Sequence, residues 1–108
     1  MTTPLPASVA AYFKIANGVD SDDIPKWFTQ DAVVKDEGQT YQGHTAIRKW
    51  QRDARQKFNY TVSPVSATLD GDRLKVMADV VGNFPGSPVK LAHWFALTDG
   101  KIASLRIG

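Results

Sequence analysis

Asp36 is the residue whose type and position most directly suggest chemistry. It lies near the end of a stretch of strand character, 32–37, in which Val34 and Asp36 share one face while Lys35 and Glu37 share the other. The pleat therefore turns this carboxylate toward the interior, which is unfavourable unless the group is protonated, hydrogen-bonded or open to a wet cavity. In a cavity Asp36 can act as a general base. The alternative is a carboxylate that caps the turn amides of residues 38–40.

Two further side chains could act with this carboxylate. His93 shares a strand face with apolar residues, so we expect it to point inward, where burial favours the neutral imidazole. It can be a hydrogen-bond donor or general acid-base in a pocket, or a core histidine bound to a backbone carbonyl. Tyr12 precedes Phe13 on a helix, so only one of the two is expected to point squarely at the core. A phenol aimed inward could donate to a ligand carbonyl, and one aimed outward is a surface tyrosine.

Aromatic side chains surround these three positions in the expected fold. They are core residues or the walls of a pocket, and together they suggest a flat or hydrophobic small molecule as the ligand. The candidate lining residues are Phe13, Trp27, Tyr41, Trp50, Phe58, Tyr60 and Phe95.

Three helices are expected in the first half of the chain. Ser8 can cap a helix that stops at Asn17-Gly18, and Asp20 with Ser21 can cap a short second helix that runs through Trp27 and Phe28. The third helix spans 43–58, because its apolar residues recur at helical spacing among charged ones.

The second half of the chain reads as four strands, 60–69, 73–84, 88–98 and 102–107, which are separated by short turns. Strands joined in this way run antiparallel, and Pro64 marks an edge or a bulge that helps the sheet curve. Helices followed by a meander predict the α+β class, with helices on one face of a bent sheet. We expect a single domain over 1–108.

Composition excludes several classes of function. The net charge of +2 is too small and too dispersed for a nucleic-acid-binding surface. No run approaches the roughly 18 apolar residues of a membrane span, and the start lacks a signal peptide, so we expect no membrane association and a cytoplasmic protein. With no cysteine and two histidines we expect no metal site, and the absence of glycine-rich phosphate loops and dinucleotide fingerprints predicts no cofactor.

Two segments resemble the SnoaL-like branch of the nuclear transport factor 2-like superfamily. They are Phe28-Thr29-Gln30-Asp31-Ala32-Val33-Val34 and Tyr41-Gln42-Gly43-His44-Thr45-Ala46-Ile47, and the segments 82–89 and 95–102 are similar to the family's closing strands. The resemblance implies a cone-shaped fold of three helices on a strongly curved, mainly antiparallel sheet. It does not fix the chemistry, because one fold hosts many functions.

Ketosteroid isomerase is the member of this superfamily with the best-understood site. Resemblance to it places Tyr12 at the oxyanion tyrosine and Asp36 at the catalytic base. The third role, a protonated carboxyl, falls at His93, so the pattern departs from the family there.

Two functions remain open at this stage. The first is a small-molecule pocket protein that moves a proton next to a carbonyl, dehydrates or cyclises its substrate, with Asp36 as base and Tyr12 and His93 at the oxygen. The second is a noncatalytic module that binds a ligand or a protein through the outer face of the sheet, near Met77, Val81 and Trp94. The same face could form a homodimer, which the resemblance implies is common. Asp79 is expected on that surface, in an ion pair or a dimer contact.

Overall fold

A six-stranded sheet forms the frame of the computed structural model, which describes residues 5–19 and 21–108. The helices are α1 (Ala7–Ala16), α2 (Ile24–Trp27), preceded by a 3-10 turn at Ser21–Asp23, and α3 (His44–Lys57). The strands are β1 (Phe28–Asp36), β2 (Gln39–Gln42), β3 (Tyr60–Asp70), β4 (Arg73–Gly82), β5 (Val89–Thr98) and β6 (Lys101–Ile107). None of the described helices has the length and apolar character needed to cross a membrane.

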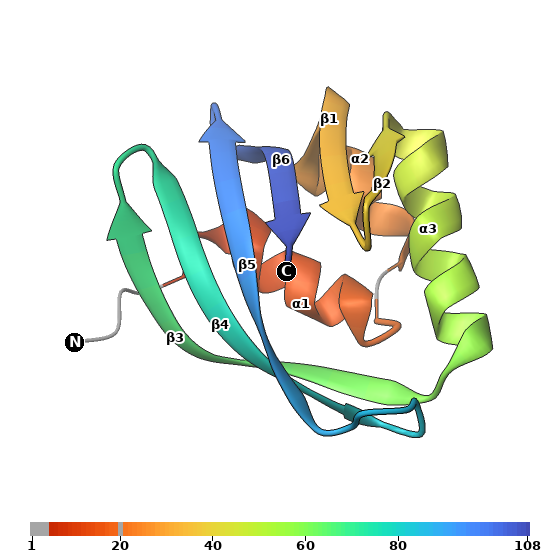
Figure 1. Cartoon of the computed structure of the whole chain (residues 1–108). Helices are drawn as coiled ribbons and strands as arrows, with labels where there is room; N and C mark the ends of the chain where they lie inside the picture. Colours follow the sequence, from red (N-terminus) through yellow and green to blue (C-terminus); the bar gives the residue numbers. More distant parts are fainter. Residues whose placement is uncertain (1–4, 20) are drawn as a thin grey trace.

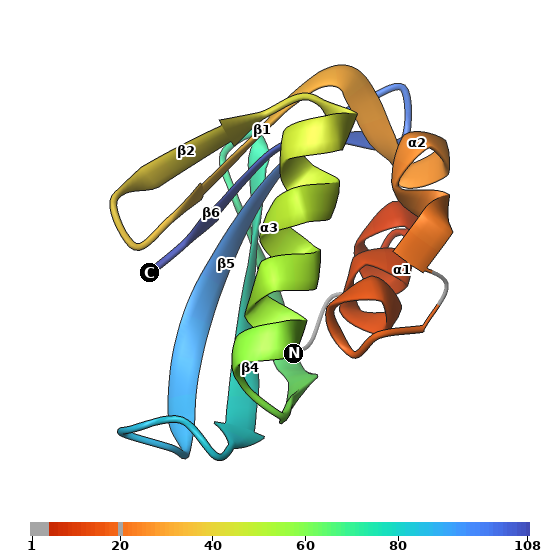
Figure 2. The same cartoon turned by 90° about the vertical axis from the view of Figure 1, so that its right-hand side faces the viewer.

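The sheet is mixed but mainly antiparallel, with the order β2-β1-β6-β5-β4-β3. The four later strands pair with their neighbours along the chain as a meander, and only β1 and β6 run parallel. Helices α1 and α3 lie on the same side of the curved sheet (Figures 1 and 2). The predicted α+β cone is therefore confirmed.

Curvature is concentrated in the long β3–β4 hairpin. Pairing shifts register between Pro64 and Ser66, which is the bulge expected at this edge strand. Figure 1 shows the two strands passing beneath the helices and then bending upward. Tyr60, Val62 and Val80 of this hairpin border the cavity described below.

The hairpin of β1 and β2 differs from the sequence prediction. Strand β1 begins at Phe28 rather than Ala32, and β2 was not predicted as a strand at all. Strand β2 has only four residues, mostly exposed, and it pairs antiparallel with the end of β1. The residues of β2 bury little apolar surface, so this strand forms because its backbone pairs with β1.

The predicted helix caps also need correction. Ser8 lies inside α1, whose first turn follows Pro6, and the serine side chain is buried instead of capping the helix end. Asp20 lies outside the described residues, and α2 follows Asp23, which forms no side-chain cap bond. The third helix has the predicted extent, flanked by Gly43 and Phe58.

The core lies between the concave face of the sheet and the helices. Its largest fully buried apolar side chains come from α1, α2, α3 and the inner faces of the strands. They are Val9, Ile15, Ile24, Phe28, Val34, Ile47, Val76, Phe95, Ile102 and Leu105.

Two polar side chains join the helices to the edge strand β3. Asn17, at the end of α1, donates to the Val62 carbonyl at 2.9 Å and accepts from the Val62 amide at 2.7 Å. Arg55 of α3 donates to the backbone carbonyls of Ala16 and Tyr60, and its guanidinium lies 4.7 Å from the Tyr60 ring centroid. These contacts fix α1, α3 and the start of β3 relative to one another.

The outer, helix-free face of the sheet carries mixed side chains. Trp94 lies between Lys75 and Arg106, at 5.1 and 5.5 Å from its ring. Asp79 pairs with Lys90 at 3.9 Å and does not border the cavity described below, in agreement with the expectation of an exposed ion pair.

Candidate functional site

A cavity of about 640 Å³ lies between α3, the end of α1 and the inner face of the sheet. Its volume falls in the range of small-molecule sites. The aromatic wall consists of Tyr12, Tyr41, Trp50, Phe58, Tyr60 and Phe84. Exposed charged residues, among them Lys49 and Asp53, stand at the rim, where the two form an ion pair of 2.7 Å.

All three residues predicted to act in catalysis border this cavity. Asp36 comes from the end of β1, His93 from the middle of β5 and Tyr12 from α1. Strand pleating accounts for the first two, because Val34 and Phe95 at the adjacent inward positions are fully buried. The three residues are far apart in the sequence, on α1, β1 and β5, so only the folded chain brings their side chains together.

Asp36 is half-buried and has one side-chain hydrogen-bond donor. The indole Nε1 of Trp50 donates to its Oδ2 at 3.2 Å. Burial raises the pKa of Asp36, the Trp50 bond acts in the opposite direction, and the charge of Glu37 raises the pKa further. The Glu37 amide contributes a smaller lowering effect. Trp50, which was not foreseen as a partner, thus replaces the turn amides of residues 38–40 that the alternative interpretation required.

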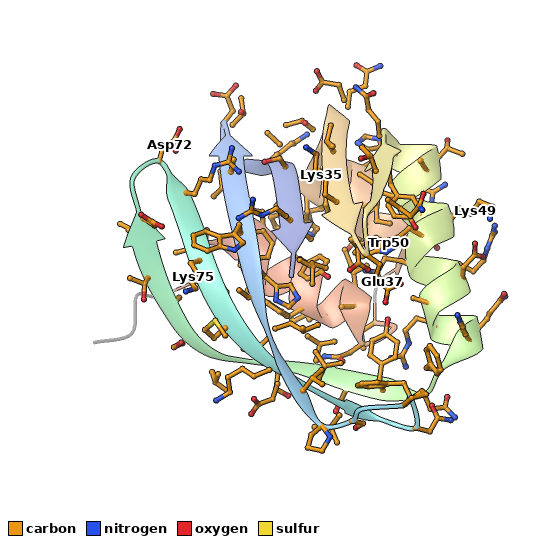
Figure 3. The ribbon with its side chains drawn as sticks, in the orientation of Figure 1. Lys35, Glu37, Lys49, Trp50, Asp72 and Lys75 are labelled. Atoms are coloured by element: carbon orange, nitrogen blue, oxygen red, sulfur yellow. The ribbon has the colours of Figure 1, made fainter. Side chains whose placement is uncertain are left out.

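Trp50 lies on the buried face of α3, three residues after Ile47, and this position brings it to Asp36. Figure 3 shows it on the side of the helix that faces the β1–β2 turn, where Glu37 lies. Its ring stacks on Tyr41 of β2, with centroids 5.8 Å apart and an interplanar angle of 29°. The stacked pair orients the indole N–H and gives the cavity a flat wall.

His93 is 2% exposed, and its Nδ1 has a carbonyl partner on the same strand. Its Nδ1 lies 3.2 Å from the Leu91 oxygen, and because a carbonyl only accepts, Nδ1 carries the hydrogen of the neutral ring. Burial lowers the pKa of His93 to about 4, although the carbonyls of Leu91 and Val76 oppose this effect. The sequence allows two interpretations of His93, a core histidine bound to a carbonyl and a residue of the pocket. The structure shows that His93 is both. In this tautomer the Nε2 of His93 is a hydrogen-bond acceptor.

Tyr12 is 3% exposed and points into the molecule. Phe13 is buried as well, with the two rings 5.2 Å apart at an edge-to-face angle of 72°, so the expectation that only one faces the core is wrong. Burial raises the pKa of the Tyr12 phenol, with smaller contributions from the charges of Tyr60 and Asp36 and an opposing one from the Gln51 amide beside it. The phenol therefore stays protonated near neutral pH and can donate a hydrogen bond.

The predicted lining is corrected at three positions. Tyr41, Trp50, Phe58 and Tyr60 border the cavity, as expected. Phe13 and Phe95 instead fill the core behind it, where both pack against His93, and Trp27 packs against the core away from the cavity. Periodicity identifies an inward face but not where along that face the packing leaves a void.

Gln51 is a buried polar residue of the cavity that sequence reasoning missed. It follows Trp50 on α3, is 6% exposed and borders the cavity. Its position four residues after Ile47 and three before Ala54 places it on the apolar stripe of the helix, and this spacing was the available signal.

Among the described residues, no group of three or more acidic or histidine side chains is placed to hold a metal ion.

Comparison with known proteins adds the family. The family model for a SnoaL-like domain matches residues 9–105. The chain belongs to the SnoaL-like family. Among curated proteins, no sequence matches it.

Three solved structures are similar to this chain in fold, and one of them is also similar in sequence. A proposed polyketide cyclase from Sinorhizobium meliloti is 43% identical, with a TM-score of 0.90 over 96% of this chain and 95% of that one. A protein with a ketosteroid isomerase-like fold from Catenulispora acidiphila, in complex with trimethylamine, has 21% identity and a TM-score of 0.82 over 97% and 86% of the two chains. A proposed isomerase of the SnoaL-like family from Agrobacterium tumefaciens has 16% identity and a TM-score of 0.77 over 93% and 92%. The last two are similar in fold alone.

Proposed function

We propose that this SnoaL-like domain binds a flat, largely hydrophobic small molecule and transfers a proton next to one of its carbonyl groups. It would act as a cofactor-independent isomerase, cyclase or dehydratase. The observation that carries the proposal is Asp36, a half-buried carboxyl with a raised pKa at the wall of an aromatic cavity. Perturbed carboxyls in clefts are frequent general bases.

The reaction begins with Asp36 as the proton acceptor. Its carboxylate takes a proton from the carbon beside the carbonyl, and the C–H electron pair moves into the carbonyl to give an enolate. A raised pKa makes the carboxylate a stronger base, while the Trp50 N–H keeps it oriented. Return of the same proton to another carbon isomerises the substrate, and attack by the enolate on a second carbonyl carbon closes a ring.

Tyr12 is the group best suited to the developing oxyanion. Its buried phenol is protonated and borders the same cavity, and a donor aimed at the oxygen in a dry site lowers the barrier more than one in water. His93 cannot share that role, since its N–H is bound to Leu91. Its Nε2, which carries no hydrogen in this tautomer, instead accepts a hydrogen bond from a substrate hydroxyl.

The family and one relative support this proposal. The relative from Sinorhizobium meliloti, which is described as a proposed polyketide cyclase, is 43% identical over nearly the whole chain. Cyclisation of a poly-carbonyl compound needs the carbanion chemistry outlined above. The substrate itself and the activity are part of the proposal.

Proton transfer can be tested without knowing the natural substrate. The parent protein is mixed with flat ketones such as 1-tetralone and 2-tetralone in heavy water, and loss of the proton signal next to the carbonyl is followed by NMR. We expect Asp36→Asn to reduce the exchange rate about 100-fold or more while ligand binding, followed by tryptophan fluorescence, changes little. Asp79→Asn, on the outer face of the sheet, is the matched control and should exchange at the parent rate.

The outcomes separate the two functions. Equal exchange rates for the parent and Asp36→Asn would discard Asp36 as the base. Tight binding without any exchange above the buffer rate would favour a noncatalytic ligand-binding domain. Absence of binding to any member of the panel would remove the flat-ligand proposal.

A further inference from the structure

Gln51 carries a buried polar atom that forms no hydrogen bond, although the Tyr12 phenol lies within reach of the same carboxamide. Its Oε1 is shielded from solvent and forms no hydrogen bond within the described structure. Ser8 Oγ is the other such side-chain atom among the described residues, but Ser8 does not border the cavity. Gln51 does, so its unpaired oxygen coincides with the candidate site.

An unpaired buried amide oxygen is unusual in a folded protein. The large majority of buried polar side-chain atoms have a partner, and the exceptions call for an explanation such as a missing ligand. The terminal torsion of glutamine is broad, so the carboxamide can turn its oxygen toward a molecule in the cavity. The Tyr12 hydroxyl lies beside the same amide and is a second group that such a molecule would meet.

The polar groups of the cavity are rich in acceptors. The Asp36 carboxylate, the Nε2 of His93 and the Oε1 of Gln51 all accept hydrogen bonds, whereas Tyr12 can donate one. A ligand that satisfies them must itself carry donors. The stacked Tyr41–Trp50 pair at the wall favours a flat, aromatic or conjugated body for that ligand.

We infer that Gln51 is a specificity-determining residue, whose carboxamide oxygen accepts a hydrogen bond from a phenolic or enolic hydroxyl of a flat ligand in the cavity. The inference rests on the proposed function for the location of the ligand, but not on proton transfer by Asp36. It names the ligand class: a conjugated ring compound with at least one hydroxyl group.

The test is a double-mutant cycle with two probes of nearly equal shape. The dissociation constants of 2-naphthol and 2-methylnaphthalene are measured by tryptophan fluorescence for the parent, Gln51→Leu and Gln51→Met. The ratio of the two constants cancels the hydrophobic contribution of the ring. We expect the dissociation constant of 2-naphthol relative to that of 2-methylnaphthalene to rise about tenfold in both variants, because they retain the apolar contact and lose the carboxamide acceptor. Gln56→Leu, an exposed change on the same helix, is the matched control and should keep the parent ratio.

Stability separates a recognition role from a structural one. With no ligand, Gln51→Leu removes an unpaired buried oxygen, so its melting temperature should rise, by about 4–8 °C if the change is about 1 kcal/mol. A fall in melting temperature together with an unchanged probe ratio overturns the inference and leaves the cavity proposal standing. A parent protein that binds neither probe overturns the cavity proposal and this inference with it.

Discussion

The buried imidazole of His93 makes the stability of this domain depend on pH. In the folded chain its pKa lies at about 4, against 6.5 for an unperturbed histidine. Between these values the unfolded chain binds a proton that the folded chain does not, so lowering the pH favours unfolding. At about 1.36 kcal/mol for each pH unit, His93 contributes about 3 kcal/mol of stability at pH 7.5, which is lost progressively as the pH falls from 6.5 to about 4.

Other groups titrate in the same range, and a variant isolates the contribution of His93. Asp36 acts in the opposite direction, because its raised pKa makes protonation stabilise the folded form. His93→Gln can keep a donor to the Leu91 carbonyl and removes the titration. The free energy of unfolding of the parent and of the variant is measured with urea at pH 7.5, 6, 5 and 4. The parent value minus the variant value should decrease by about 3 kcal/mol from pH 7.5 to pH 4.

A direct titration supports the same measurement. The chemical shift of the His93 ring proton should titrate with a midpoint at about pH 4, and a His44→Gln variant identifies which signal is which. A His93 signal that titrates near pH 6.5, or parent and variant curves that stay parallel, would refute the burial argument.

Two further predictions concern packing and assembly. A Cβ on Gly82 would lie 2.2 Å from the Asn59 carbonyl oxygen and 2.6 Å from Tyr60 Cβ. Gly82→Ala should therefore lower the free energy of unfolding by about 2 kcal/mol or more. A urea midpoint equal to that of the parent contradicts this prediction. We also predict a homodimer formed through the outer face of the sheet, where Val81 is exposed. Light scattering should give twice 11.9 kDa for the parent and the monomer mass for Val81→Glu. A parent that is already monomeric contradicts this prediction.

Local sequence signals predicted the elements that depend on local physics. The third helix and the meander strands follow from apolar periodicity and turn residues, and the inward direction of Asp36 and His93 follows from alternation along a strand. Strand β2 could not be predicted in this way. Its four mostly exposed residues form a strand only because β1 pairs with them.

The shape of the cavity depends on contacts between distant elements. Phe95 and Tyr60 both face the concave side of the sheet, yet only Tyr60 borders the cavity, because the Tyr12 and Phe13 rings of α1 cover Phe95. The partner of Asp36, Trp50, lies 14 residues away and reaches it only when α3 crosses β1. Such pairings require the three-dimensional arrangement, which no single-chain pattern contains.

The side chain of Asn17 has a consequence for how copies of this chain can associate. Its amide imitates a peptide group and saturates both hydrogen-bonding atoms of Val62 on the outermost strand β3. A foreign strand that tried to lengthen the sheet at this border would have to displace it, and the Pro64 irregularity follows two residues later. Fibre-like growth along this border is thereby obstructed.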